Sequence, residues 1–169
     1  ADGTGAHLAS VSSTDVDAGL GGDDTIVVGD GSGAIVGGIG ADRIEAGAGG
    51  HDVAGDNAEL RYAPGGRLVR LATLDTANAS GGADMVTLGA GANRVAGGVG
   101  GDTITLGQGV REVLGDNGVL TYSADGVLRQ QVLSTGFEEG LGGDDTLVTL
   151  DGAGVLVGGF GSDRLTSGA

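Results

Sequence analysis

Aspartate recurs in this chain at a fixed position of a nine-residue frame, and it does so in every second row of that frame. In each block of rows, the first and third rows carry Asp at position six. These residues are Asp24, Asp42, Asp84, Asp102, Asp145 and Asp163. Carboxylates brought close together repel one another unless a cation lies between them. Ca²⁺ prefers such oxygen ligands and takes six to eight of them at about 2.3–2.6 Å. The pattern therefore favours the binding of a divalent cation.

The nine-residue frame organises most of the sequence. Four rows follow one another from Gly19, four from Ala79 and three from Gly140. All eleven rows hold Ile, Leu or Val at position eight and Gly at position four. One aliphatic residue in nine predicts that each row adds one thin layer to a core of small side chains.

Each block of four rows is followed by an insert, which gives a superrepeat of about 60 residues. Residues 1–18 are expected to be the end of a truncated insert. The first superrepeat spans 19–78, with rows at 19–54 and an insert at 55–78, and the second spans 79–139, with rows at 79–114 and an insert at 115–139. A third, truncated copy spans 140–169. We expect one continuous domain.

Three rows carry a more specific signature. GGIGADRIE at 37–45, GGVGGDTIT at 97–105 and GGFGSDRLT at 158–166 match Gly-Gly-x-Gly-x-Asp-x-U-x, with U a large aliphatic residue. They resemble the calcium-binding nonapeptide repeats of the RTX (repeats-in-toxin, hemolysin-type) family. The resemblance implies an all-β fold, a right-handed parallel β-roll or β-solenoid, in which each row forms a turn and a short strand. It also implies several Ca²⁺ ions, each held between two turns by Asp carboxylates and backbone carbonyls.

In such a roll, consecutive rows turn on opposite edges, so the aspartates of rows one and three share one edge. Adjacent coils are about 4.8 Å apart, which places their carboxylates within reach of one ion. The predicted pairs are Asp24 with Asp42, Asp84 with Asp102, and Asp145 with Asp163. On the opposite edge, position six holds Gly33, His51, Asn93, Arg111 and Gly154. That edge is expected to bind calcium weakly or not at all, with Arg111 donating to turn carbonyls instead.

The sequences of the inserts are compatible with two different structures. They begin GDNAELRYAPGGRL and GDNGVLTYSADGVL. The favoured hypothesis is that each insert supplies two more coils, with Tyr62 in a core position. The alternative is a β-hairpin that projects from the roll, with APGG and SADG as its turns. If the coil continues, Asp56 and Asp116 fall on the Asp edge and are candidate ligands of a further ion, although an ordinary Asx turn explains them equally well.

Composition limits the function. The chain has 40 Gly, no Cys, and 23 acidic against eight basic residues, for a formal charge of −15. Such a charge disfavours nucleic acid and anionic lipid, and no apolar run approaches the roughly 20 residues of a membrane span. No nucleophile elbow or zinc-protease motif is present, so we expect no enzymatic activity. Arg43, Arg94 and Arg164, at position seven, are expected to face outward and screen the acidic surface.

These observations predict a calcium-stabilised structural segment of a large secreted or cell-surface protein, such as a stalk, an adhesin spacer or a fibre subunit. It would be disordered without Ca²⁺ and fold outside the cell. Its expected partners are further copies of the repeat, in the same chain or end to end in a filament. The alternative is the calcium-folding, secretion-assisting RTX tail of an exported enzyme or toxin.

Overall fold

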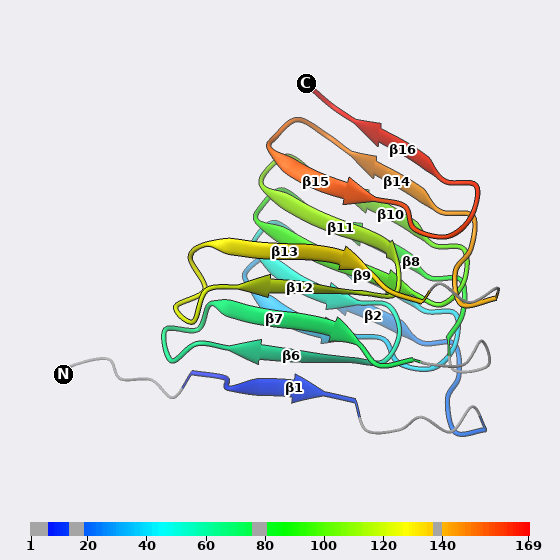
Figure 1. Cartoon of the computed structure of the whole chain (residues 1–169), viewed down its shortest axis with the longest axis horizontal. Helices are drawn as coiled ribbons and strands as arrows, with labels where there is room; N and C mark the ends of the chain where they lie inside the picture. Colours follow the sequence, from blue (N-terminus) through cyan, green and yellow to red (C-terminus); the bar gives the residue numbers. More distant parts are fainter. Residues whose placement is uncertain (1–6, 14–18, 76–80, 137–139) are drawn as a thin grey trace.

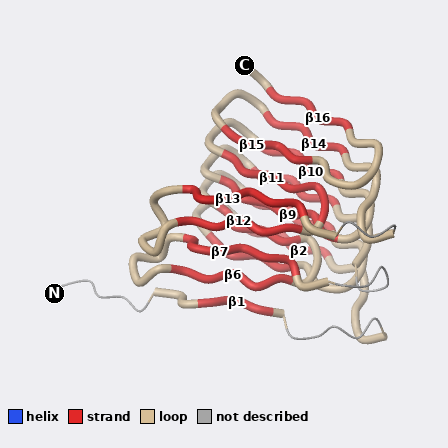
Figure 2. Tube along the Cα trace, viewed as in Figure 1, coloured by secondary structure: helices blue, strands red, loops and turns tan. Residues whose placement is uncertain are grey.

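The computed structural model describes residues 7–13, 19–75, 81–136 and 140–169, and every regular element in these ranges is a β-strand (Figure 1). Short strands joined by turns and loops make up the whole described chain, as Figure 2 shows. The described residues include no helix long and apolar enough to cross a membrane. The strands form three sheets, two of them parallel and one antiparallel.

The nine-residue rows build the two parallel sheets, and the chain passes from one sheet to the other with each row. Rows one and three form the outer sheet, in the order β16 (Arg164–Ser167), β14 (Thr146–Thr149), β10 (Thr103–Leu106), β8 (Met85–Leu88), β4 (Arg43–Ala46) and β2 (Thr25–Val28). Rows two and four form the middle sheet, in the order β15 (Gly154–Val157), β11 (Arg111–Asp116), β9 (Asn93–Gly98), β5 (His51–Ala54) and β3 (Gly33–Val36). This alternation is consistent with a β-roll.

The aliphatic residues at position eight meet between the outer and middle sheets. Ile44 and Val86 are paired neighbours in the outer sheet, as are Val53 and Val95 in the middle sheet, and all four are fully buried. Because the rows stack in register, each aliphatic side chain covers the one in the next coil. Leu165 lies in β16, the last strand of the outer sheet, and is 43% exposed.

The inserts form a third sheet, the hairpin sheet, which is antiparallel. Each insert is a hairpin, β6 (Ala58–Tyr62) with β7 (Leu68–Thr73) and β12 (Gly118–Tyr122) with β13 (Arg129–Ser134). β1 (Ser10–Ser12) pairs with β6 in the way that β7 pairs with β12. The turns fall at APGG and SADG, where Gly66 and Gly126 adopt φ of 75° and 71°. This left-handed conformation costs glycine little.

The hypothesis that each insert adds two coils is therefore wrong. β8 pairs directly with β4, so the roll resumes after the first hairpin as if no insert were present. The hairpin alternative places the turns correctly, but the hairpins lie flat against the middle sheet instead of projecting. The reason is the period-two pattern of the insert strands, in which Leu60 is fully buried and Arg61 is exposed. A strand with one apolar face is stabilised when another sheet packs against that face. The insert strands therefore pack on the middle sheet instead of joining the coil.

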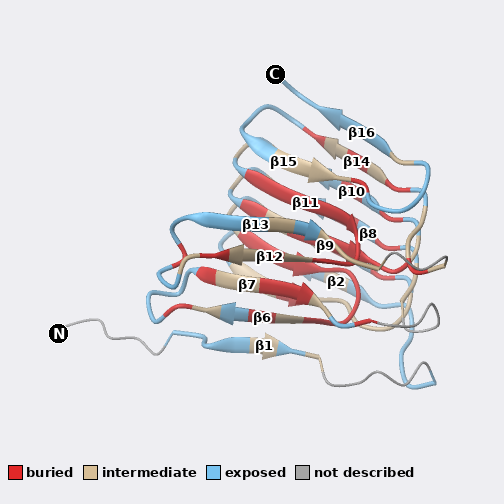
Figure 3. Cartoon of the chain, viewed as in Figure 1, coloured by how far each residue is buried: buried red, intermediate tan, exposed pale blue. Residues whose placement is uncertain are grey.

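A second apolar core lies between the middle sheet and the hairpin sheet. Its fully buried members are Ala54, Ala96 and Leu114 from the middle sheet and Ala58, Leu60, Leu71 and Leu120 from the hairpins. The middle sheet is consequently covered on both faces, and Figure 3 shows β9 and β11 coloured mainly as buried. The fold thus has three layers, and its three most buried strands, β5, β9 and β11, lie in the middle layer.

A polar network centred on Arg94 joins the hairpins to the middle sheet. Arg94 donates from Nη1 to Asp52 Oδ1 at 3.0 Å and from Nε to the hydroxyl of Tyr122 at 2.9 Å. The Tyr122 hydroxyl donates to Glu112 Oε2 at 2.9 Å, and Arg129 reaches Glu112 Oε1 at 3.1 Å. The expectation that Arg94 faces outward to screen the surface is wrong, because the hairpin sheet covers this face of β9.

We expect Arg94→Ala to lower the free energy of unfolding of the calcium-saturated chain by about 3–5 kcal/mol, because it leaves the buried carboxylates of Asp52 and Glu112 without their shared cation. Urea denaturation followed by circular dichroism would measure the loss. Arg164→Ala is the matched control, since Arg164 holds position seven of its row but is exposed, and it should cost less than about 0.5 kcal/mol. Equal losses in the two variants would contradict this role.

Candidate metal site

The six aspartates at position six lie along one edge of the roll, each directly before a strand of the outer sheet. They form a continuous ladder in which the backbone N–H of one Asp donates to Oδ1 of the Asp in the next coil. The donor–acceptor distances are 2.8 Å for Asp24 to Asp42, 2.7 Å for Asp42 to Asp84, 2.8 Å for Asp84 to Asp102, 2.7 Å for Asp102 to Asp145 and 3.1 Å for Asp145 to Asp163.

The ladder contains the three pairs predicted from the sequence and two contacts that were not predicted. Asp42 stacks on Asp84, and Asp102 on Asp145, across the points where the inserts leave the roll. These contacts exist because the hairpins add no coil, so that row three of one copy is the direct neighbour of row one of the next. The structure thus describes one uninterrupted row of carboxylates in place of three separate pairs.

The second carboxylate oxygen of each inner aspartate lacks a donor. Oδ2 of Asp42, Asp84, Asp102 and Asp145 is buried and has no hydrogen-bond partner among the described residues. Buried carboxylate oxygens are normally hydrogen-bonded, and leaving one bare costs about 1–3 kcal/mol or more for a charged group. An unpaired carboxylate oxygen that recurs in successive coils indicates a binding partner other than a hydrogen-bond donor of the protein.

Backbone carbonyls face the same space. A β-carbon on Gly97 would overlap both Asp102 Oδ2 and the carbonyl oxygen of Gly115, and one on Gly55 would overlap Asp84 Oδ2. Glycine is therefore required here, and it leaves carboxylate and carbonyl oxygens gathered around one small cradle. Within the described ranges no three acidic or histidine side chains converge as a metal cluster, so a ligand shell has to include such carbonyls. An all-oxygen set of this kind suits Ca²⁺.

The electrostatics of the ladder point the same way. Burial, followed by repulsion from neighbouring carboxylates, raises the pKa of Asp102 to about 10. The same causes, against the lowering effect of a backbone hydrogen bond, raise the pKa of Asp84 and of Asp145 to about 7. Desolvation disfavours the charged form of a carboxyl group, and an adjacent like charge adds to the effect. A row of ionised carboxylates at neutral pH thus requires compensating positive charge.

On the opposite edge, position six is occupied by residues that do not require a compensating positive charge. Asn93 accepts from the backbone N–H of His51 at 3.1 Å through Oδ1 and donates from Nδ2 to the carbonyl of Gly89 at 2.9 Å. Arg111, which is 2% exposed, donates from Nη1 to the carbonyl of Gly109 at 3.1 Å, as the sequence predicted for it. The side-chain nitrogens of Asn93 and Arg111 therefore pair with turn carbonyls here, whereas both ring nitrogens of the buried His51 have no hydrogen-bond partner among the described residues. At position six of the Asp edge, the side chains offer only acceptors.

The two remaining candidates, Asp56 and Asp116, lie at the base of the hairpins and not in an extra coil. Asp56 Oδ2 accepts from the N–H of Val99 at 2.6 Å and Oδ1 from that of Gly82 at 3.3 Å. Burial raises the pKa of Asp56 to about 9, and the carboxylate that adds most to this rise is Asp84. Asp56 is thus placed against the turns of the next copy.

Asp116 repeats this arrangement one copy later. Its carboxylate accepts from the N–H groups of Gly143, at 3.1 Å, and Phe160. Burial raises its pKa to about 6. The two carboxylates serve as acceptors for backbone amides of the following coils, and a role as calcium ligands stays a prediction.

Sequence reasoning missed Gly55 and Gly115, the first residues of the two GDN triplets. Their carbonyl oxygens face the positions where β-carbons of Gly37 and Gly97 would lie, next to Asp42 Oδ2 and Asp102 Oδ2. The available signal was the frame itself, because Gly55 and Gly115 follow row four directly.

Comparison with protein families gives one finding. A family model described as the RTX calcium-binding nonapeptide repeat matches the chain in four copies, over residues 18–50, 74–109 and 139–169. No curated protein and no solved structure matches the chain. The matched ranges contain all six aspartates of the ladder, while both hairpins lie entirely outside them.

Proposed function

The chain belongs to the RTX calcium-binding nonapeptide repeat family, and from this premise we propose that it is a calcium-stabilised structural segment of a secreted or cell-surface repeat protein. Stalk, adhesin spacer and fibre subunit are the roles that such a segment would serve, and none of them involves catalysis. The proposal rests above all on one observation, the row of buried Oδ2 atoms without donors along the Asp edge.

The residues of the ladder would make folding depend on calcium. Between coils, Asp42, Asp84, Asp102 and Asp145 bring carboxylates together with glycine carbonyls and leave no donor among them. Calcium, when bound, supplies the positive charge and the coordination that these oxygens lack. Glycine-rich turns also cost much conformational entropy on folding, which the small aliphatic core offsets only in part. The chain would therefore stay disordered where calcium is scarce.

Its location follows from this balance. Extracellular calcium modules bind with Kd on the order of 10⁻⁴–10⁻³ M, so calcium outside the cell would drive folding and calcium in the cytosol would not. A segment that is unfolded before export and folded afterwards suits a secreted or surface protein. We infer that further copies of the superrepeat are its natural neighbours, in the same chain or in another one.

The geometry supports a role as a spacer. Each superrepeat adds two strands to the outer, middle and hairpin sheets alike. At about 4.8 Å per strand, one superrepeat lengthens the stack by about 9.6 Å without changing its cross-section. A protein could thus set the reach of a surface domain by the number of such copies.

A calcium titration followed by far-UV circular dichroism tests the proposal. We expect a cooperative gain of β-signal as Ca²⁺ is added to the calcium-free chain at pH 7.5, no comparable gain with Mg²⁺, and loss of the signal when a chelator is added. Mg²⁺ demands a smaller octahedral shell and gives up its waters reluctantly, which makes it the appropriate control. A calcium-free chain that is already folded, and stays so with chelator, would overturn the proposed mechanism.

A further inference from the structure

The carboxylates of Asp56 and Asp116 each join the base of one hairpin to the turns of the following superrepeat. Asp56 is fully buried and Asp116 is 1% exposed, and none of the ion pairs among the described residues includes either of them. Both oxygens of each carboxylate accept backbone N–H groups, whereas Oδ2 of each inner ladder aspartate accepts none. The two hairpin-base aspartates therefore have their partners within the protein, because buried N–H groups need acceptors.

The amides bound by Asp56 belong to the first and third rows of the second superrepeat. Asp56 Oδ1 accepts from the N–H of Gly82 at 3.3 Å, and Oδ2 accepts from that of Val99 at 2.6 Å. The backbone N–H of Asp56 donates to the carbonyl of Gly97 at 3.2 Å. That carbonyl and Asp84 Oδ2 face the same small cradle. Asp56 thus fixes one of the carbonyls that the Asp edge offers to calcium.

The same contacts recur one superrepeat later. Asp116 accepts from the N–H groups of Gly143, at 3.1 Å, and Phe160. Its own N–H donates to the carbonyl of Gly158 at 3.2 Å, and that carbonyl faces the cradle next to Asp145 Oδ2. The two aspartates thus cross the two boundaries between superrepeats in the same way.

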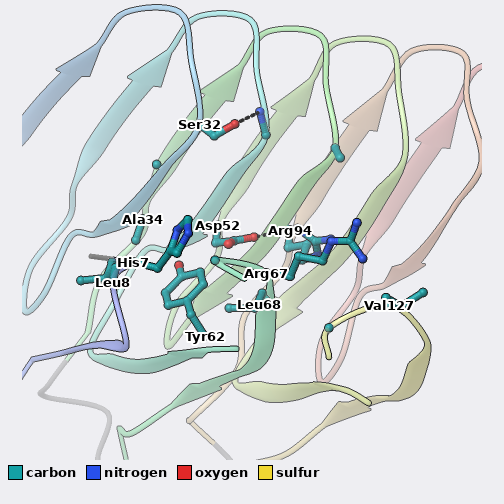
Figure 4. Close-up of a pocket in the computed structure, with 15 residues that line it drawn as sticks. His7, Leu8, Ser32, Ala34, Asp52, Tyr62, Arg67, Leu68, Arg94 and Val127 are labelled. Carbon is teal, nitrogen blue, oxygen red and sulfur yellow. Dashed lines mark hydrogen bonds and ion pairs between the residues drawn. The ribbon is translucent and has the colours of Figure 1, made fainter. Parts of the chain in front are cut away.

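The two boundaries differ on the middle sheet. At the first, Asp52 of β5 and Arg94 of β9 are paired neighbours and form an ion pair at 3.0 Å, which Figure 4 shows. At the second, Glu112 of β11 has Val155 of β15 as its neighbour, and valine offers no charge. The second boundary therefore depends more strongly on its hairpin-base aspartate.

We propose that Asp56 and Asp116 are positioning residues for calcium, and that each couples the folding of the superrepeat that follows it to the hairpin before it. By holding the turns, each aspartate keeps a cradle carbonyl next to a ladder carboxylate and so raises the calcium affinity of the next copy. Repeats that contact only their neighbours fold together because of the contacts between them. The inference rests on the proposed calcium-dependent folding and adds the contacts that make several copies fold as one unit.

Three backbone amides of the ladder report on the three superrepeats. They belong to Asp24, Asp84 and Asp145, each of which donates to the next aspartate of its own superrepeat. ¹H–¹⁵N spectra of the full chain would be recorded at pH 7.5, from chelator to saturating Ca²⁺. In the unmodified chain we expect all three amides to reach their folded positions at one calcium concentration, and three separate midpoints would overturn the coupling. A folded spectrum in chelator would contradict the proposed function instead, and a urea series with the same amides would then test the coupling.

Alanine substitutions test each boundary separately, because they remove both acceptors. We expect Asp56→Ala to raise the calcium midpoint of the Asp84 amide at least about threefold relative to that of Asp24. Asp116→Ala should leave Asp24 and Asp84 together and raise the midpoint of Asp145, by more than Asp56→Ala raises that of Asp84. Equal shifts of all three amides would show general destabilisation and overturn the proposal.

Further variants separate positioning from charge and from calcium ligation. Asp56→Asn removes the same charge but keeps one acceptor, so it should cause a smaller shift of the same amide, and it decides the question should the alanine variant not fold. Asp23→Ala removes an exposed carboxylate that accepts an N–H within the first superrepeat at 2.9 Å, and it should separate no midpoints. Equilibrium dialysis should find the same amount of calcium bound at saturation in every variant. Fewer bound ions in Asp56→Ala would make this carboxylate a ligand and overturn its role as a positioning residue.

Discussion

The calcium-free chain is expected to fold when the pH is lowered from 8 to 4, so that its need for calcium disappears in acid. In the calcium-free fold, burial and neighbouring carboxylates raise the pKa of Asp84 and Asp145 to about 7 and that of Asp102 to about 10, from an ordinary value of 3.8. The folded chain therefore holds more protons than the unfolded chain between pH 4 and these values. Its free energy of unfolding must fall as the pH rises through this window.

The size of this effect is large for a marginally stable domain. For Asp84 alone, the rise in pKa from 3.8 to about 7 corresponds to roughly 4 kcal/mol of stability that is present at pH 4 and lost by about pH 8. Several buried aspartates act together, while the net stability of a domain is only about 5–15 kcal/mol. Protons and calcium are thus alternative ways of compensating the same carboxylates.

Far-UV circular dichroism at a series of pH values, with chelator and with saturating Ca²⁺, checks this expectation. With chelator, the β-signal should be lost as the pH rises from 4 to 8. The calcium concentration at the folding midpoint should decrease as the pH falls, because protons already neutralise the carboxylates of the ladder. A calcium-free chain that unfolds further on acidification would contradict the assignment of the ladder as the source of calcium dependence.

Replacing the four inner aspartates together, Asp42→Asn, Asp84→Asn, Asp102→Asn and Asp145→Asn, is expected to yield a chain that folds in chelator and gains nothing from calcium. Each asparagine keeps Oδ1, which accepts the backbone N–H of the preceding coil, and places an amide donor where Oδ2 now faces glycine carbonyls. The opposite edge already contains this arrangement at Asn93, whose Nδ2 donates to the carbonyl of Gly89.

The matched control removes the same number of charges from exposed turns of the roll. Asp23, Asp30, Asp144 and Asp151 accept backbone N–H groups of the next coils through Oδ1 and are exposed. Their four asparagine substitutions should leave the calcium midpoint within about twofold of the unmodified chain, a difference of less than about 0.5 kcal/mol. If both quadruple variants became independent of calcium, net charge and not the ladder would be responsible.

Sequence periodicity was sufficient to predict the two parallel sheets, because the aliphatic residue at position eight and the Gly at position four repeat without exception. It also placed the six aspartates on one edge, since rows that alternate between two sheets must alternate between two edges. The residues most reliably predicted, such as Ile44 and Asp102, are those whose role depends only on their place in the frame.

The remaining features of the fold depend on the inserts, and the nine-residue frame does not determine which structure the inserts adopt. Tyr62 happens to fall at position eight of a notional fifth row, and this coincidence favoured a continued coil. The competing signal was the alternation of buried Leu60 with exposed Arg61, which is typical of a strand covered on one face. Without the hairpin sheet, neither the continuity of the Asp ladder nor the partial burial of Arg94 could be foreseen, since both follow from where the hairpins lie.

The stacking of short strands also determines how the segment would carry tension. In all three sheets the strands lie across the stack, so the hydrogen bonds between them run along it. A pull on the two ends loads these bonds in series, and the chain yields by releasing one coil at a time from an end. The carboxylate ladder crosses every one of these boundaries on the Asp edge. The ambient calcium level would therefore set the force at which a stretched segment begins to lengthen.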